Sequence, residues 1–349
     1  MSDAMFRFGL VGAGTHGLRA VIPAFETSAG CRLEAVADTS PARLDALPPS
    51  LRRYASLEAM LASEALDGVY IATLPDTHCE LALACFRHGL HVICEKPLAT
   101  TLEEAQRMAE AALAARRELV VMFEYRFLPH YEKIREWIAS GRIGRVEAIH
   151  LQQLRKHPVA QPRRTNLLNA AGSLDCGIHR LDLARFWTGG ARWETVHALG
   201  TWFEEPVKKP PHISILARLA NGVMVTLNES FSYGYRLKRM PYTFSKNSLA
   251  IVGSHGVIHD VGGGRAGYEL VTQEGSETVP FIKTSHRDEI PKVLDAFARF
   301  LNGRDDARLA FAEDGLEAQR IVDQANRDAC ISRADDSSFH HHPATLALS

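Results

Sequence analysis

Short apolar runs alternate with amphipathic stretches along the first part of the chain. The runs predict buried strands at residues 6–11, 32–37, 69–72, 91–94 and 119–123. The stretches between and after them predict helices at 16–27, 41–47, 57–64, 77–89 and 102–117, with Ser56 as an N-cap and Gly89 as a C-cap. Because strands and helices alternate at this spacing, the pattern favours βαβ units and a parallel sheet.

The pattern changes after residue 125. Longer runs typical of strands follow, at 146–154, 213–219, 223–231 and 248–252. Helices are predicted at 130–140, 175–187, 289–301 and 313–328. A turn at 220–222 separates two of the strands, as in a hairpin. This part of the chain therefore predicts an α+β fold with a large, mostly antiparallel sheet that carries helices on one face.

Two domains and a tail follow from this change of pattern. Residues 1–125 are expected to form an α/β domain, and residues 126–332 a C-terminal α+β domain for substrate binding and oligomerisation. Residues 333–349 are polar, without a pattern, and are expected to be disordered. The run of histidines at 340–342 has no cysteine or carboxylate spaced to complete a site, so no metal is expected.

Charge and cysteine content narrow the classes of function. The 349 residues contain 40 Lys and Arg against 41 Asp and Glu, a formal net charge of −1. A nucleic-acid binder or a polybasic membrane-surface protein would show a basic excess, so neither is expected. The six cysteines form no CxxC pair, and neither a signal peptide nor a run of ~18 apolar residues for a membrane span is found. A soluble, cytoplasmic protein with reduced thiols is expected.

A GxGxxG pattern stands between the first predicted strand and the first predicted helix, formed by Gly12, Ala13, Gly14, Thr15, His16 and Gly17. The first glycine permits a tight turn, the second lets the backbone approach a pyrophosphate, and the third lets the helix pack on the strand. The N-terminus of the helix then offers N–H groups and a partial positive charge to the phosphates. The N-terminal domain is therefore expected to be a Rossmann domain that binds a dinucleotide.

Asp38 ends the second predicted strand, about 20 residues after the glycines. A carboxylate there can accept hydrogen bonds from the adenosine ribose hydroxyls, and it repels a 2′-phosphate. NAD is therefore the expected cofactor. Arg43 keeps NADP possible, because a cation close to Asp38 could meet that phosphate.

Further motifs extend beyond the glycine loop. They are the stretch 69–78, the run Cys94-Glu95-Lys96-Pro97-Leu98, the segment 125–129, the turn 141–144 and the stretch 172–182. Together they resemble the Gfo/Idh/MocA family, which includes glucose–fructose oxidoreductase and inositol dehydrogenase, and the likeness runs from Gly12 to about Ala325. The resemblance implies an NAD(P)-dependent dehydrogenase or reductase acting on a C–OH carbon of a sugar, cyclitol or related polyol. It also implies a strand at 125–129 and a catalytic helix at 172–182.

Three residues of these motifs suit proton transfer. Lys96 follows a predicted strand, at the carboxyl edge of the sheet where ligands bind in open α/β folds. Asp175 and His179 lie four residues apart and so share a helix face, and Gly177 between them would let a ligand approach. Histidine titrates near neutral pH, and a carboxylate can orient it. The resemblance implies that these three groups surround the reacting carbon, and we expect His179 as the base, Lys96 beside the developing alkoxide and Asp175 orienting His179.

The resemblance also implies cofactor contacts outside the glycine loop, from Thr73, Leu74, Pro75, His78, Glu95, Lys96 and Arg126. Two alternatives stay open: His78 could make only local bonds at a helix start, and Arg126 could pair with a carboxylate. In the family, the Lys-Pro bond before Pro97 is often cis.

Substrate contacts are expected from Arg155, Lys156 and Asp182. The basic residues at 155–156 and 163–164 could recognise an acidic or phosphorylated substrate, or they could be solvated surface charges. Two departures from the family pattern lie near the expected pocket. Glu124 stands where the family commonly has Asn, and Ala170-Ala171 stands where it has glycines, so the substrate stays open.

Two other functions stay open on the same fold. The protein could be a regulator that senses a dinucleotide or sugar without catalysis, although Lys96 and His179 argue against this because a sensor needs no proton relay. It could also reduce a non-sugar carbonyl or imine, since the fold does not fix the substrate. The expected partners are a small-molecule substrate and further copies of the chain. The alternating run 223–228 leaves one sheet face available, so a homodimer or homotetramer is expected.

Overall fold

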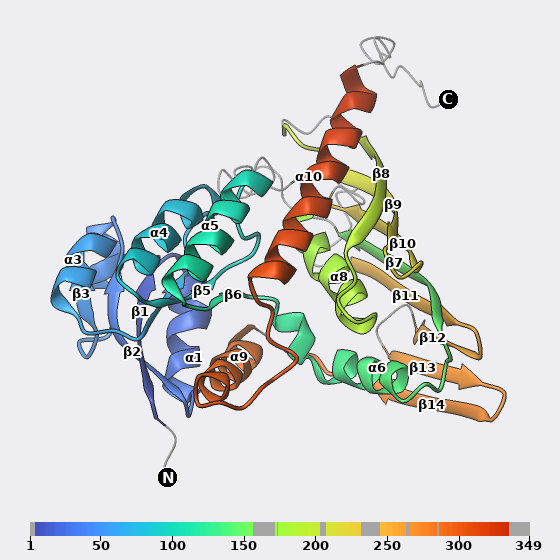
Figure 1. Ribbon diagram of the computed structural model, residues 1–349, viewed down its shortest axis with the longest axis horizontal. Coiled ribbons are helices and arrows are strands. Elements are labelled where there is room, and N and C mark those ends of the chain that lie inside the picture. The colour runs from blue at the N-terminus through green and yellow to red at the C-terminus, as the bar shows by residue number, and fades with distance from the viewer. Residues whose placement is uncertain are drawn as a thin grey trace, which may run out of the picture.

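Two sheets stand side by side in the molecule, with helices between and around them (Figure 1). The computed structural model describes residues 4–155, 172, 174–202, 207–231, 245–262, 266–284 and 286–334. The tail expected to be disordered lies outside these residues, except that residues 333 and 334 end the last helix. No helix in the described ranges is long and apolar enough to cross a bilayer.

The first sheet is the predicted parallel one. Its six strands run in the order β3-β2-β1-β4-β5-β6, the order of a Rossmann fold. The strands are β1 (Phe6–Val11), β2 (Cys31–Ala37), β3 (Arg52–Tyr54), β4 (Gly68–Ile71), β5 (His91–Cys94) and β6 (Leu119–Val121). Five of them were expected from their apolar runs. Strand β3 was not, because its three residues include two exposed arginines and no apolar run marks it.

Helices cover both faces of this sheet. One face carries α3 (Leu57–Ser63), α4 (Pro75–Arg87) and α5 (Leu102–Ala115). The short α2 (Pro41–Asp45) follows β2, and its Leu44 packs with the apolar cluster of the other face. Ser56 caps α3 as predicted, because its side chain accepts a hydrogen bond from the Ala59 N–H. The other face carries α1 (Ile22–Thr27) and α9 (His286–Leu301), which pack on Phe8, Leu10 and Tyr70. Helix α9 thus returns from the last part of the chain to complete the first domain's core.

The helix after the glycine loop begins with a wide turn. Residues Gly17–Val21 form a π-helical turn, and α1 follows from Ile22. Pro23 has no N–H to bond the carbonyl of Arg19 four residues before it, which accounts for the loss of the regular α-helical bond there. The expected helix at 16–27 is therefore present, with its first turn widened.

The second sheet has eight strands in the order β14-β13-β12-β11-β7-β10-β9-β8. Its strands are β7 (Val146–Arg155), β8 (Trp193–Thr201), β9 (His212–Leu219), β10 (Met224–Ser230), β11 (Ser245–Gly253), β12 (Gly256–Val261), β13 (Gly267–Thr272) and β14 (Gly275–Pro280). Only β7 and β10 pair in parallel; all the other described pairs are antiparallel. The turn at 220–222 joins β9 to β10, with Gly222 at a positive φ of 90°.

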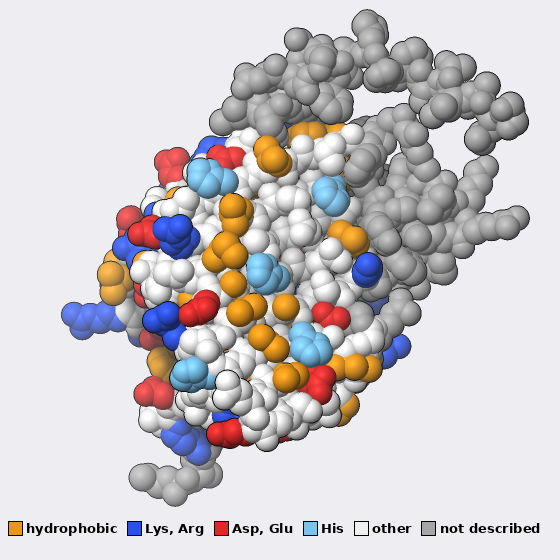
Figure 2. All heavy atoms as spheres, turned by 90° about the vertical axis from the view of Figure 1, so that its right-hand side faces the viewer, with side chains coloured by type: hydrophobic (Ala, Val, Ile, Leu, Met, Phe, Trp, Pro, Cys, Tyr) orange, Lys and Arg blue, Asp and Glu red, His pale blue; other side chains and the backbone are white. Residues whose placement is uncertain are grey.

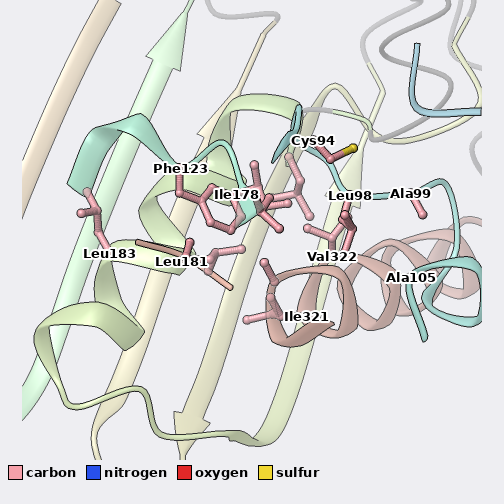
Figure 3. Close-up of a cluster of buried hydrophobic side chains, with 14 of the residues drawn as sticks. Cys94, Leu98, Ala99, Ala105, Phe123, Ile178, Leu181, Leu183, Ile321 and Val322 are labelled. Carbon is pink, nitrogen blue, oxygen red and sulfur yellow. The ribbon is translucent and has the colours of Figure 1, made fainter. Parts of the chain in front are cut away.

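The helices that the structure describes over the second sheet lie on one of its faces, as predicted. They are α6 (Pro129–Ala139), α8 (Leu174–Trp187) and the long α10 (Ala312–Ala334), and they lie between the second sheet and the first domain (Figure 1). Leu98 and Cys94 of the first domain pack there against Ile178 of α8 and Ile321 of α10 (Figure 3). A continuous apolar core therefore joins the two parts of the chain beside the edge where the Rossmann strands end.

The segment expected as a strand at 125–129 is not one. Strand β6 ends at Val121, and residues Glu124–Phe127 form a 3₁₀ turn that leads into α6 at Pro129. Proline is well placed in the first turn of a helix, where its missing N–H has no partner to bond. The turn directs Tyr125 and Arg126 toward α8.

Candidate active site

The glycine loop has the geometry that a pyrophosphate requires. Gly12 has a φ of +102°, and a Cβ there would lie 2.7 Å from the Ala72 carbonyl oxygen. A Cβ on Gly17 would collide with the Gly12 carbonyl, so the third glycine allows close packing of helix and strand. A Cβ on Gly14 meets no atom within 4 Å. The open backbone at Gly14, beside the helix start at His16, fits a dinucleotide pyrophosphate.

Asp38 holds the glycine loop against the end of β2. One carboxylate oxygen accepts from the Ala13 N–H at 2.7 Å, and the other accepts from the Ser40 N–H at 2.8 Å. Arg43 Nη1 lies 3.4 Å from both oxygens, while most of its side chain is exposed. An ionised carboxylate offers about four acceptor positions, and the two N–H groups and the two longer contacts of Arg43 use them, so ribose hydroxyls would bind Asp38 in place of Arg43.

We predict that Asp38→Ser shifts cofactor preference toward NADP. The change removes the charge that repels a 2′-phosphate and releases Arg43, whose guanidinium can then bind it. The ratio of NAD to NADP affinity is expected to fall by about tenfold or more, equivalent to ~1.4 kcal/mol. Titration of both cofactors checks this, with Asp38→Ser/Arg43→Gln as the control that should lose the NADP gain. Tighter NADP binding by the unmodified protein would contradict the NAD preference.

Glu95 connects the glycine loop to the turn that carries Lys96. Its Oε1 lies 2.7 Å from His16 Nε2 and accepts from the Tyr70 hydroxyl at 2.7 Å. Burial alone would raise the pKa of Glu95, but His16, Tyr70 and Lys96 together lower this pKa to about 2. Glu95 is therefore an ionised anchor between the two loops, placed beside the expected cofactor site.

Lys96 lies just after β5 and reaches across to α8. Its Nζ donates to the Asp175 carbonyl at 2.9 Å and to Asp175 Oδ1 at 3.2 Å. The Lys96–Pro97 bond is cis, as the resemblance implied. Burial favours a lower pKa for Lys96, but Asp175, Cys176 and Glu95 outweigh it and raise the pKa above its usual range. Lys96 is therefore a protonated ammonium contributed by the first domain to the second.

His179 lies one helical turn after Asp175 and is only 2% exposed. Its ring stacks on Tyr125 with centroids 4.2 Å apart and meets Phe123 edge-on at 5.9 Å. Its Nε2 lies 3.8 Å from Glu124 Oε1. The contacts that the structure gives for the Asp175 carboxylate are with Lys96, so the orienting of His179 by Asp175 stays a prediction.

His78 and the loop before it lie between the cofactor loop and the Lys96 turn. The buried His78 Nδ1 is 3.1 Å from the Pro97 carbonyl oxygen, and Nε2 is 3.4 Å from the Thr73 carbonyl oxygen. Burial lowers the pKa of His78, so a neutral ring supports the cis turn. These two contacts agree with the alternative in which His78 makes only local bonds near the start of its helix. Leu74 is exposed at the start of α4, next to Pro75.

Arg126 forms a buried ion-pair network. Its Nε and Nη2 donate to the two oxygens of Asp182 at 2.8 and 2.6 Å, and Nη1 donates to Asp314 and the Leu309 carbonyl. Asp314 also binds Arg185 at 3.0 Å. These contacts agree with the second alternative for Arg126, in which it pairs with a carboxylate. Asp182 is fully buried in the same pair, so we leave both residues outside the proposed site.

Arg155, expected as a substrate contact, lies near Asp175, whereas Tyr125 and Glu229 were not identified as site residues from the sequence. Arg155, at the end of β7, donates to Cys176 Sγ at 3.2 Å, beside Asp175. Tyr125 stacks on His179, and Glu229 of β10 packs against Gly177. Lys156, residues 163–164 and Ala170-Ala171 lie outside the described residues.

Comparisons with known proteins agree with this geometry. A model of the oxidoreductase family with an NAD-binding Rossmann fold matches residues 6–125, and the GFO/IDH/MocA C-terminal domain matches residues 131–259. Inositol 2-dehydrogenase of Rhizobium meliloti is 27% identical over 94% of this chain and 98% of its own. The rhizopine catabolism protein MocA of Rhizobium meliloti is 32% identical over 66% of this chain and 73% of its own.

Solved structures share the fold over almost the whole chain. An oxidoreductase from Agrobacterium radiobacter, in complex with NAD+, L-tartaric acid and magnesium, has a TM-score of 0.80 at 22% identity and covers 95% of this chain and 98% of its own. An inositol dehydrogenase homolog from Azotobacter vinelandii, with NADH and myo-inositol, has a TM-score of 0.77 at 20% identity, covering 93% and 96%. The chain is an NAD-binding oxidoreductase and belongs to the Gfo/Idh/MocA family.

Proposed function

We propose that this protein transfers a hydride between NAD and a C–OH or C=O carbon of a sugar, cyclitol or related polyol. The observation that carries the proposal is the contact between Lys96 and Asp175, which joins the two parts of the chain beside the glycine loop. His179 lies one helical turn farther along α8, so the chain carries an imidazole one turn from the contact between the Lys96 ammonium and the Asp175 carboxylate. The activities for which the relatives are named, which include inositol and D-xylose dehydrogenases, support the polyol class.

Each of these residues has a role in the proposed reaction. Bound NAD supplies the nicotinamide ring that exchanges the hydride. Lys96 carries three N–H donors, and Asp175 takes up two of them within the described residues, which leaves one for the reacting oxygen. Because Lys96 keeps its proton, it stabilises negative charge on that oxygen, and His179 is the group suited to accept the hydroxyl proton. Asp175 then positions Lys96 and, as expected from the sequence, His179.

A substrate panel tests the proposed function. Reduction of NAD is followed at the nicotinamide absorbance with myo-inositol, D-xylose and further aldoses and polyols. The expected result is turnover of at least one of them that Lys96→Ala abolishes. If NAD and a polyol bind but no member of the panel is oxidised or reduced with either cofactor, the protein is a sensor, and the proposal fails.

We also propose that the protein assembles through the open face of the second sheet. No described helix covers this face, and Figure 2 shows hydrophobic and histidine side chains spread over it, with most Lys and Arg near one edge. Its exposed apolar side chains include Leu199, Leu216 and Met224. A face of this kind favours binding of a second copy of the chain.

The cytoplasmic location and the domain division near residue 125 stay predictions.

We predict a homodimer or homotetramer that Leu216→Glu disrupts. Leu216 is 51% exposed, and a carboxylate placed there in a sheet-to-sheet interface would be desolvated without a partner. Light scattering after size exclusion at micromolar concentration should show the unmodified assembly and a smaller variant. The matched control is Leu113→Glu on α5, where the leucine is already 81% exposed and no assembly change is expected. A monomeric mass for the unmodified protein would contradict this assembly.

A further inference from the structure

A polar cluster lies between α8 and the inner face of the second sheet. It consists of Gln153, Arg155, Arg180 and Glu229, and we name it the inner polar cluster. Gln153 and Glu229 are directly opposite each other on the parallel pair β7 and β10. Arg155 is two residues after Gln153 on the same strand, so both side chains lie on the same face of the sheet. Gln153, Arg155 and Glu229 therefore lie on the inner face of two central strands, and Arg180 belongs to α8.

The inner polar cluster adjoins the proposed active site. Arg155 Nη1 lies 3.2 Å from Sγ of Cys176, the residue after Asp175. Glu229 packs so closely on α8 that its Cγ would lie 3.4 Å from a Cβ placed on Gly177. Arg180 follows His179 directly on the same helix. Along α8, Arg180 is thus less than two turns from Asp175, the residue that Lys96 contacts, and it is next to His179.

Four buried polar atoms in the inner polar cluster have no hydrogen-bond partner among the residues that the structure describes. They are Oε1 and Oε2 of Glu229, Oε1 of Gln153 and Nε of Arg180, although Glu229 is 0% exposed. Neither Arg155 nor Arg180 forms an ion pair with a carboxylate among the residues that the structure describes. The nearby Arg126 and Arg185 differ sharply, because Asp182 and Asp314 pair with them. Most buried polar groups in folded proteins are paired, so this site has unused capacity for a ligand.

The charges of the inner polar cluster do not balance. Arg155 and Arg180 bring two positive charges, and Glu229 can bring at most one negative charge. The nearby Lys96 adds no net positive charge, because the Asp175 carboxylate pairs with it. Burial raises the pKa of Glu229 to about 8, although Arg180 and Arg155 oppose this, so Glu229 is largely protonated at neutral pH. The cluster is net positive in either protonation state, and burying such charge is costly without an anion.

We propose that the inner polar cluster binds an oxyanion group, a carboxylate or a phosphate ester, of an acidic polyol substrate. The inference rests on the proposed function, because it places the rest of that substrate at Lys96 and His179. The guanidinium fork of Arg155 donates two parallel N–H bonds to such a group, and Arg180 adds a second cation behind it. Gln153 and Glu229 bind the neighbouring hydroxyls. The substrate class is therefore a sugar acid or sugar phosphate.

Matched pairs of ligands test this assignment. The pairs differ only in the anionic group: D-glucuronate and D-glucose 6-phosphate against D-glucose, and L-tartrate against L-threitol. Dissociation constants are measured by calorimetry with NADH present, and kcat/KM with NAD. The expected result is at least about tenfold tighter binding of an anionic member than of its neutral counterpart. The carboxylate and phosphate arms show which oxyanion fits. If no anionic member binds or reacts better than its neutral counterpart, the proposal is overturned.

Variants locate the effect at the cluster. Arg155→Gln should weaken binding of the preferred anionic ligand about 10- to 100-fold and leave the neutral counterpart nearly unchanged. Glu229→Gln keeps the shape and the neutral state that Glu229 mostly has at neutral pH, so anion binding should not weaken. The matched control is Arg145→Gln, an arginine whose side chain is 80% exposed, which should change neither. An unchanged anion preference in Arg155→Gln would overturn the proposal. If anion binding depends on Arg155 but no ligand is turned over, the proposed oxyanion site is supported and the proposed reaction is contradicted.

Discussion

Lys96→Ala is expected to lower turnover by about 10²- to 10⁴-fold while NAD still binds. The ammonium sits between the Rossmann edge and α8, where Asp175 holds it at 2.9 and 3.2 Å. Its raised pKa keeps it charged throughout the working pH range, so its removal leaves a developing alkoxide without its nearest cation. The measurements are kcat on the substrate identified by the panel and the dissociation constant of NADH.

His179→Ala should show a loss of similar size, because the imidazole is the proposed base. Lys283→Ala is the control for Lys96→Ala, since Lys283 is an exposed lysine of the second domain. Asp175→Asn should lose less, with a loss that depends on pH, because the amide still accepts from Lys96 but no longer carries charge. Near-full turnover in both Lys96→Ala and His179→Ala would show that the proton is handled elsewhere.

Gly14→Val is expected to weaken NAD binding by about 100-fold or more, equivalent to ~2.7 kcal/mol, while the protein still folds. The backbone around Gly14 has room, because an added Cβ meets no protein atom within 4 Å. That room faces the expected pyrophosphate, so a branched side chain fills the space that the ligand needs. Titration with NADH measures the affinity, and the melting temperature of the free protein reports the fold.

Gly12→Val gives the contrasting result. At a φ of +102°, with the Ala72 carbonyl oxygen 2.7 Å from an added Cβ, this change strains the apo protein as well. Its melting temperature should fall, whereas that of Gly14→Val should stay close to the parent. If NADH binds Gly14→Val as tightly as the parent, the pyrophosphate does not lie at this loop.

The parallel sheet could be predicted because its strands are buried on both faces and form continuous apolar runs. The runs at β1, β4 and β5 gave nearly the observed bounds. Strands β12, β13 and β14 were not identified, because their hairpins are short and β14 is largely exposed and polar. The wide turn before α1 and the 3₁₀ turn at Glu124–Phe127 depend on single prolines and tertiary contacts, which periodicity does not report.

For the site, sequence spacing indicated which residues share an element but not their partners across elements. Asp175 and His179 were correctly placed on one helix, yet the partner given for the Asp175 carboxylate is Lys96, 79 positions earlier. One usable signal was overlooked. Along β7 and β10, the inward positions read Ile149, Leu151, Gln153 and Val225, Leu227, Glu229. A polar residue at a core position of an alternating strand usually has a functional role, because apolar residues pack the core better.

Helix α9 has a consequence for how the chain is made. It covers the face of the first sheet formed by Phe8, Leu10 and Tyr70, yet it begins only at His286. A ribosome that has released the Rossmann strands must still synthesise the whole second sheet before that cover emerges. During this interval the nascent first domain displays an apolar face of its own, a surface that chaperones recognise and that promotes aggregation. Completion of the first domain's core is therefore coupled to synthesis of the second sheet, because α9 follows β14 in the chain.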